Sequence, residues 1–80
     1  LDSACELWGQ ARNLAPGSHA LVYNLGVCAE SRGDLDAALA LYRQSDRLLG
    51  KPDDDITLAL GRVNDAIRNR SKLKEQLGGK

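Results

Sequence analysis

Few side chains in this sequence have the chemistry of a catalyst, and those few are scattered. His19 is the single histidine of the 80-residue chain. A Ser–His–Asp or Cys–His arrangement would need this histidine as its base. Neither Cys5 nor Cys28 has a spacing from it that suggests such a pair. Because no acid, base and nucleophile come together, the sequence predicts a protein that is not an enzyme.

The acidic run at residues 53–55 is the main candidate for a cation site. A calcium loop spaces its ligands around a glycine and closes with a glutamate, and this run has neither. Carboxylates in the first turn of a helix, facing the positive end of its dipole, are the favoured interpretation. The tail at 78–80 has no preceding strand and no following Ser or Thr, so it is not a phosphate loop. No metal or cofactor is expected.

The two cysteines are too few for a disulfide-stapled scaffold. Each lies within an apolar helical stripe, where a free cysteine packs as a small hydrophobic residue. Two buried thiols are therefore favoured over a disulfide. A zinc site needs four clustered ligands, and the two cysteines and one histidine are too few and too far apart. The redox compartment stays open.

The charge balance argues against some classes of partner. The chain has 11 basic and 11 acidic side chains, and this zero net charge does not favour nucleic acid. No stretch approaches the 18 apolar residues of a membrane span. Residues 62–80 carry six basic and two acidic groups, which we interpret as a solvated terminal helix. The length indicates a single domain over residues 1–80 with a thin core.

Segments rich in Ala, Leu, Arg and Glu alternate with clusters of turn residues, and none shows the period-two alternation of a strand. We therefore predict an all-α fold of four antiparallel helices, at residues 2–14, 19–32, 35–49 and 54–77. Ser18 and Asp34 are expected to cap the second and third helices. Gly50 suits a left-handed position at the end of the third helix.

Helical spacing indicates which side of the second helix is buried. Val22, Leu25, Gly26 and Ala29 follow the i, i+3, i+4, i+7 pattern of a core stripe. In the first helix Trp8 is the matching core candidate. Opposite the stripe lie Tyr23, Val27, Glu30 and Ser31. Gly26 and Ala38 are small, which predicts a close approach of two backbones.

An internal repeat emerges when the chain is shifted by 34 residues. Ala4 then falls on Ala38 and Trp8 on Tyr42, so that a small residue precedes an aromatic one by four positions in both copies. The stripe of the second helix also falls on apolar residues of the last helix, with Val22 on Ile56. A shift of 35 residues instead aligns two Leu-Gly pairs, so the register of the last helix stays open.

Residues 19–52 resemble one tetratricopeptide repeat, a 34-residue helix–turn–helix unit. The matching residues are Val22, Leu25-Gly26, Gly33-Asp34, Ala38 and Tyr42. Residues 2–16 resemble the second helix of a preceding repeat, and residues 54–77 resemble a terminal capping helix. Ala29, Ser45 and Gly50 depart from the pattern. The resemblance implies a right-handed α-α superhelix.

The resemblance also implies a function. Tetratricopeptide arrays bind a protein or peptide partner on the concave surface formed by the first helix of each repeat. The residues of this chain that correspond to that surface are Tyr23, Asn24, Val27, Glu30 and Ser31. Family members that grip acidic chaperone tails place Asn at the position of Asn24 but also need nearby Lys and Arg, which this chain lacks. Tight binding of acidic tails is therefore not expected.

Other roles remain open beside a protein-interaction scaffold. The chain could be a purely structural cap of a longer array, or a regulatory or oligomerisation extension of a larger protein. The helix at 2–14 has no partner before it in the sequence, so an upstream part of its own chain is expected to cover it. Both the cytoplasm and the bacterial periplasm or cell envelope are compatible with the resemblance.

Overall fold

The computed structural model describes residues 2–14 and 17–78, and its regular structure is helical throughout that part of the chain. The four helices are α1 (Asp2–Leu14), α2 (His19–Ser31), α3 (Leu35–Leu49) and α4 (Asp54–Gly78). Each boundary lies within one residue of its predicted position. The all-α expectation is thus confirmed. Among the described residues, no helix is both long enough and apolar enough to cross a membrane.

Local capping chemistry explains where the helices begin and end. Ser18, Asp34 and Asp53 each accept a hydrogen bond from the backbone N–H three residues later, at 3.3, 3.3 and 3.1 Å. These bonds satisfy amides that a helix cannot pair internally. Gly50 has a φ of 74° at the end of α3, which confirms its left-handed position. Any residue with a Cβ would be strained in this conformation.

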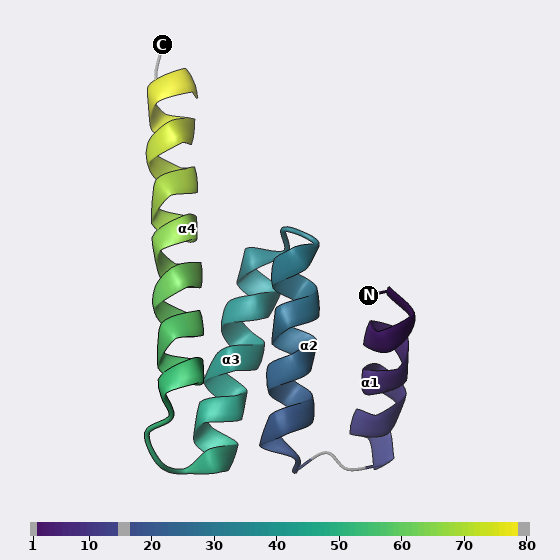
Figure 1. Ribbon diagram of the computed structural model, residues 1–80. Coiled ribbons are helices and arrows are strands. Elements are labelled where there is room, and N and C mark those ends of the chain that lie inside the picture. Colours follow the sequence, from purple (N-terminus) through teal and green to yellow (C-terminus); the bar gives the residue numbers. More distant parts are fainter. Residues whose placement is uncertain (1, 15–16, 79–80) are drawn as a thin grey trace.

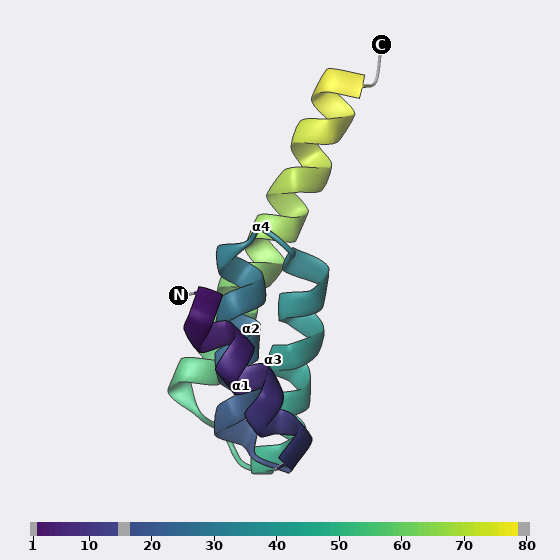
Figure 2. The same cartoon turned by 90° about the vertical axis from the view of Figure 1, so that its right-hand side faces the viewer.

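Each helix packs against the next along the chain, and successive helices run in opposite directions (Figure 1). The molecule measures 49 × 29 × 15 Å, so it is elongated and thin. The view in Figure 2 shows that the C-terminal part of α4 extends beyond the other helices. Since α3 runs back between them, α2 and α4 are parallel and start at the same end of the molecule.

The main core cluster draws on three helices. Its members share an exposure of 1% or less: Ala29 of α2, Ala38 and Tyr42 of α3, and Ala59 and Val63 of α4. At Gly26 the structure shows the close approach of a side chain, where the sequence predicts a second backbone. A Cβ built on Gly26 would lie 2.7 Å from Cε1 of Tyr42. The aromatic ring of α3 therefore occupies the space that glycine leaves free on α2.

Burial in α4 resolves the register that the sequence left open. Ile56 and Val63 are 3% and 0% exposed, and their counterparts at a shift of 34 residues, Val22 and Ala29, are 0% and 1% exposed. A shift of 35 residues would pair buried Gly26 with exposed Gly61. The 34-residue shift is thus the one that matches burial in the two helices.

Two predictions about core residues are wrong. Trp8 and Leu25 are half-buried and do not belong to the fully buried core. Tyr23 and Val27 do not face away from the core, because both pack against its main cluster. The physical reason is that α2 contacts α1 on one side and lies against α3 on another, with α4 close by. Most of its circumference is therefore partly covered, and a single stripe does not describe it.

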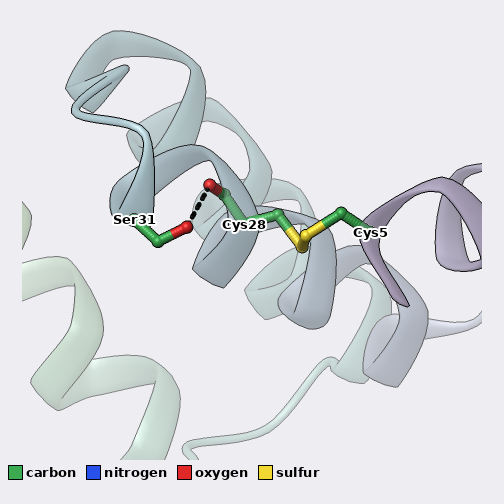
Figure 3. Close-up of a disulfide and its surroundings, with 3 residues drawn as sticks. All are labelled: Cys5, Cys28 and Ser31. Atoms are coloured by element: carbon green, nitrogen blue, oxygen red, sulfur yellow. Dashed lines mark hydrogen bonds between the residues drawn. A yellow bond between two sulfur atoms is a disulfide. The ribbon is translucent and has the colours of Figure 1, made fainter. Parts of the chain in front are cut away.

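The expectation of two free thiols is also wrong, because Cys5 and Cys28 form a disulfide that joins α1 to α2 (Figure 3). Their Cα atoms are 5.9 Å apart, within the range that a disulfide spans. Both cysteines are buried, as predicted. Helical spacing within each segment could not show that the packing of α1 on α2 brings the two stripes together at these positions.

Candidate functional site

A cavity of about 170 Å³ lies between the first turns of α2 and α4. It exists because these two parallel helices start at the same end of the molecule. The α2 side is formed by two i, i+4 pairs, which place their side chains on one face of the helix. The lining residues are His19, Ala20, Tyr23, Asn24, Asp53, Asp55 and Ile56.

The cavity combines apolar walls with negative charge. Tyr23, Ala20 and Ile56 supply the apolar surface, while Asp53 and Asp55 supply carboxylates. Asp53 caps α4 through one of its oxygens, which accepts from the backbone N–H of Ile56 at 3.1 Å. Asp55 is exposed in the first turn of α4. Neither Lys nor Arg is among the residues that line the cavity.

Tyr23 is positioned by the core beneath it. Its ring centroid lies 5.4 Å from that of Tyr42, in a tilted arrangement that aromatic pairs prefer. Tyr23 is half-buried, so one part of the ring supports the fold and another lines the cavity. Asn24, also half-buried, adds an amide with both donor and acceptor capacity.

Further along α2, a polar cluster ties α2, α3 and α4 together. Glu30 accepts hydrogen bonds from Nε of Arg62 at 2.5 Å and from a terminal nitrogen of Arg62 at 2.8 Å. It also accepts from the hydroxyl of Tyr42 at 2.8 Å. Such bidentate, charge-assisted pairs are the stronger kind of ion pair. No buried side-chain polar atom lacks a partner in the described part of the chain.

The cluster shifts the proton affinities of its members. The hydrogen bonds from Arg62, and secondly that from Tyr42, hold the pKa of Glu30 below its usual value, against the opposing effect of burial. Burial, followed by the hydrogen bond to Glu30, raises the pKa of Tyr42. The hydrogen bonds to Glu30 raise the pKa of Arg62. All three shifts favour the charged pair and the protonated phenol in which the cluster is satisfied.

The structure brings together two of the five residues predicted to bind a partner. Tyr23 and Asn24 line the cavity. Val27 packs against the core cluster, and Glu30 is held by Arg62 and Tyr42. Ser31 is exposed outside the cavity, and its hydroxyl donates to the carbonyl of Cys28 at 2.8 Å (Figure 3).

Sequence reasoning missed the remaining lining residues, namely His19, Ala20, Asp53, Asp55 and Ile56. One signal pointed to those of α4. The 34-residue shift pairs Val22 with Ile56 and so places the first turn of α4 in the role of the first turn of α2. That the two turns face each other across a cavity follows only from the path of α3 between them.

A second cavity, of about 400 Å³, lies between α1 and α2. It is lined by Cys5, Glu6, Leu25, Cys28 and Arg32, and the disulfide is therefore part of its wall. Among the described residues, no three His, Cys, Asp or Glu side chains are grouped so that they could hold a metal ion.

Comparison of the chain with protein-family models, with curated proteins and with solved structures finds no match.

Proposed function

We propose that this chain is a protein-interaction module similar to a tetratricopeptide repeat, and that it binds a peptide or protein segment in the cavity between α2 and α4. The observation that carries the proposal is the lining of that cavity. Tyr23 and Asn24, two residues that the family resemblance assigns to the binding surface, border it together with the first turn of α4. Tyrosine is enriched at the energetically dominant positions of protein interfaces.

The repeated burial pattern supports the same proposal. Val22 and Ile56 occupy equivalent buried positions 34 residues apart, and so do Ala29 and Val63. In helical-repeat proteins each unit contacts its neighbours, and stacked equivalent helices create extended binding surfaces. In this chain α2 and α4 are the equivalent, parallel helices, and the cavity lies between them.

The lining indicates the chemistry of the bound segment. Asp53 and Asp55 favour a basic side chain, since complementary charge directs encounter and selects among partners. The ring of Tyr23 adds an aromatic surface on which a Lys or Arg side chain gains cation–π energy. Acidic segments are disfavoured because neither Lys nor Arg lines the cavity. A short segment with a basic residue beside an apolar one fits best.

A second candidate is a structural cap that closes an array of helical repeats. Its support is the exposure of α4 at residues 68–74, since terminal repeats carry a polar outer face. This candidate predicts that the cavity between α2 and α4 has no ligand.

Selection from a phage-displayed peptide library, followed by titration calorimetry of the enriched peptides, separates the two candidates. We expect enriched peptides to carry Lys or Arg. Asp55→Asn should weaken their binding by up to about fivefold, the range of an exposed ion pair. Asp54→Asn is the matched control, because Asp54 is exposed in the same turn but does not line the cavity.

Tyr23→Ala should weaken binding by about tenfold or more, as truncation of an aromatic anchor does. Circular dichroism must show that this variant remains folded, since Tyr23 also packs against Tyr42. Arg43→Ala, an exposed change outside the cavity, should leave binding unaltered. Failure to enrich any peptide, or equal binding by the Asp55 and Asp54 variants, would contradict the proposed site.

A further inference from the structure

The disulfide joins α1 covalently to the rest of the molecule. Cys5 is the buried residue among the α1 side chains that the structure describes. Leu7 and Leu14 are 64% and 89% exposed, and none of the α1 side chains that the structure describes belongs to the main core cluster. Trp8 and Ala11 are only half-buried. Among the described side chains, the non-covalent packing of α1 on α2 therefore uses half-buried residues, with Cys5 as the buried one.

A helix as short as α1 depends on contacts with the rest of the protein for its stability. It has 13 residues, and isolated helices of that length are marginal in water because nucleation is costly. If the bond between Cys5 and Cys28 opens, the remaining contacts must hold α1 in place by themselves. The members of the main core cluster come from α2, α3 and α4, and we expect this cluster to persist when α1 is released.

The disulfide borders a cavity on one side. The cavity of about 400 Å³ between α1 and α2 has both cysteines in its wall. Cys5 is 9% exposed and Cys28 is 1% exposed, so Cys5 is the more open of the two residues. One carboxylate, Glu6, and one guanidinium, Arg32, also line the cavity. Their opposite charges balance, so the cavity has no net negative charge that would repel an incoming thiolate.

We infer that the Cys5–Cys28 disulfide is a site of thiol–disulfide exchange with a dithiol reductant, and that its opening releases α1 from α2. A thiolate of the reductant attacks Sγ of Cys5, forming a mixed disulfide while Cys28 leaves as a thiolate and takes up a proton. The second thiolate of the reductant then attacks the reductant's other sulfur, the one bonded to Cys5. Cys5 leaves as a thiolate and takes up a proton. The protein gains two electrons and two protons, and the dithiol becomes a cyclic disulfide.

The consequence is a change in which face of α2 is covered. In the oxidised protein, α1 lies against the side of α2 that carries Leu25 and Cys28. In the reduced protein this side becomes available. The cavity between α2 and α4 is lined by other residues, so the inference stands independently of the proposed function.

Trp8 is the single tryptophan of the chain and lies on α1, so its fluorescence reports on the position of this helix. Treatment of the oxidised protein with dithiothreitol should shift the Trp8 emission to longer wavelength and increase its quenching by acrylamide. Amide protons of α3 should keep their protection from exchange. An unchanged emission and quenching after complete reduction would show that α1 stays docked and would overturn the inference.

The double variant Cys5→Ser with Cys28→Ser provides the control. It should show the emission of the reduced protein and no response to dithiothreitol. If its emission instead matches that of the oxidised protein, non-covalent contacts suffice to hold α1, and release by reduction is refuted.

A second experiment tests which sulfur is attacked. The oxidised protein is exposed briefly to glutathione, quenched with acid, alkylated and digested with trypsin. Cleavage after Arg12 and Arg32 places the two cysteines in different peptides. Glutathione should be found mainly on the Cys5 peptide. Equal labelling of both, or predominant labelling of Cys28, would contradict the assigned direction of attack.

Discussion

Replacing Gly26 with alanine should destabilise the protein, although alanine is the better helix former. A Cβ at position 26 would lie 2.7 Å from Cε1 and 2.8 Å from Cδ1 of Tyr42. Carbon atoms make their best contact at about 3.5–4.0 Å, so the ring would have to move by about 0.8 Å. It has little room to do so, because Tyr42 is fully buried and its hydroxyl donates to Glu30 at 2.8 Å.

The expected change in the free energy of unfolding is the balance of two opposing effects. Overpacking of a core costs about 1–3 kcal/mol, and two contacts this short place the variant towards the upper end. Replacing glycine by alanine inside a helix contributes about 1 kcal/mol in the other direction. The net loss is about 1–2 kcal/mol. For a domain of this size, that corresponds to a fall in Tm of roughly 5–15 °C.

Gly61→Ala is the matched control. Gly61 also lies inside a helix, α4, but a Cβ there would meet nothing within 4 Å. This variant should gain about 0.5–1 kcal/mol from helix propensity alone. Urea and thermal unfolding of both oxidised variants, followed by circular dichroism, measure the two effects. If Gly26→Ala is as stable as the parent protein, or gains as much as Gly61→Ala, the ring of Tyr42 does not fill the site.

Two further changes test the polar contacts of the core. Ser45 is fully buried, and its hydroxyl donates to the carbonyl of His19 at 2.8 Å. Ser45→Ala should therefore lower the free energy of unfolding by about 1–2 kcal/mol, measured in urea. Ser71→Ala, at an exposed position, is the control and should have no measurable effect. The hydrogen bonds from Arg62 lower the pKa of Glu30 below 4.5, so their stabilisation is present above pH 4.5 and is lost as the pH falls through the lowered pKa. Glu30→Gln should therefore be less stable than the parent by about 1 kcal/mol at pH 7, with a difference that narrows on acidification. An equal difference at neutral and acidic pH would refute the role of this carboxylate.

Helix boundaries were predictable because they depend on interactions between residues close in the chain. Ser18 and Asp34 each pair with an amide three residues away, and Gly50 needs only its own backbone conformation. The burial of Val22 and Tyr42 was equally predictable from the sequence, since apolar spacing of three and four residues marks a helix face. These features require no knowledge of how separate helices meet.

The candidate site was predictable only in part. Tyr23 and Asn24 were recognised through the family resemblance, and both line the cavity. The sequence predicts the same open surface for Val27 and Glu30, whereas in the structure Val27 packs on the core and Glu30 is bound by Arg62. The sequence of α2 does not show where Arg62 lies in space, because Arg62 is 32 residues after Glu30 in the chain.

The sequence by itself determined the four helices, their caps, and the small and aromatic residues that the core would use. Only the tertiary structure decided that Cys5 meets Cys28, that Glu30 meets Arg62, and that α2 and α4 enclose a cavity at their first turns. The physical reason is that helical periodicity determines which residues share a face. The rotation and offset of one helix against another are set by side chains that interlock from distant segments.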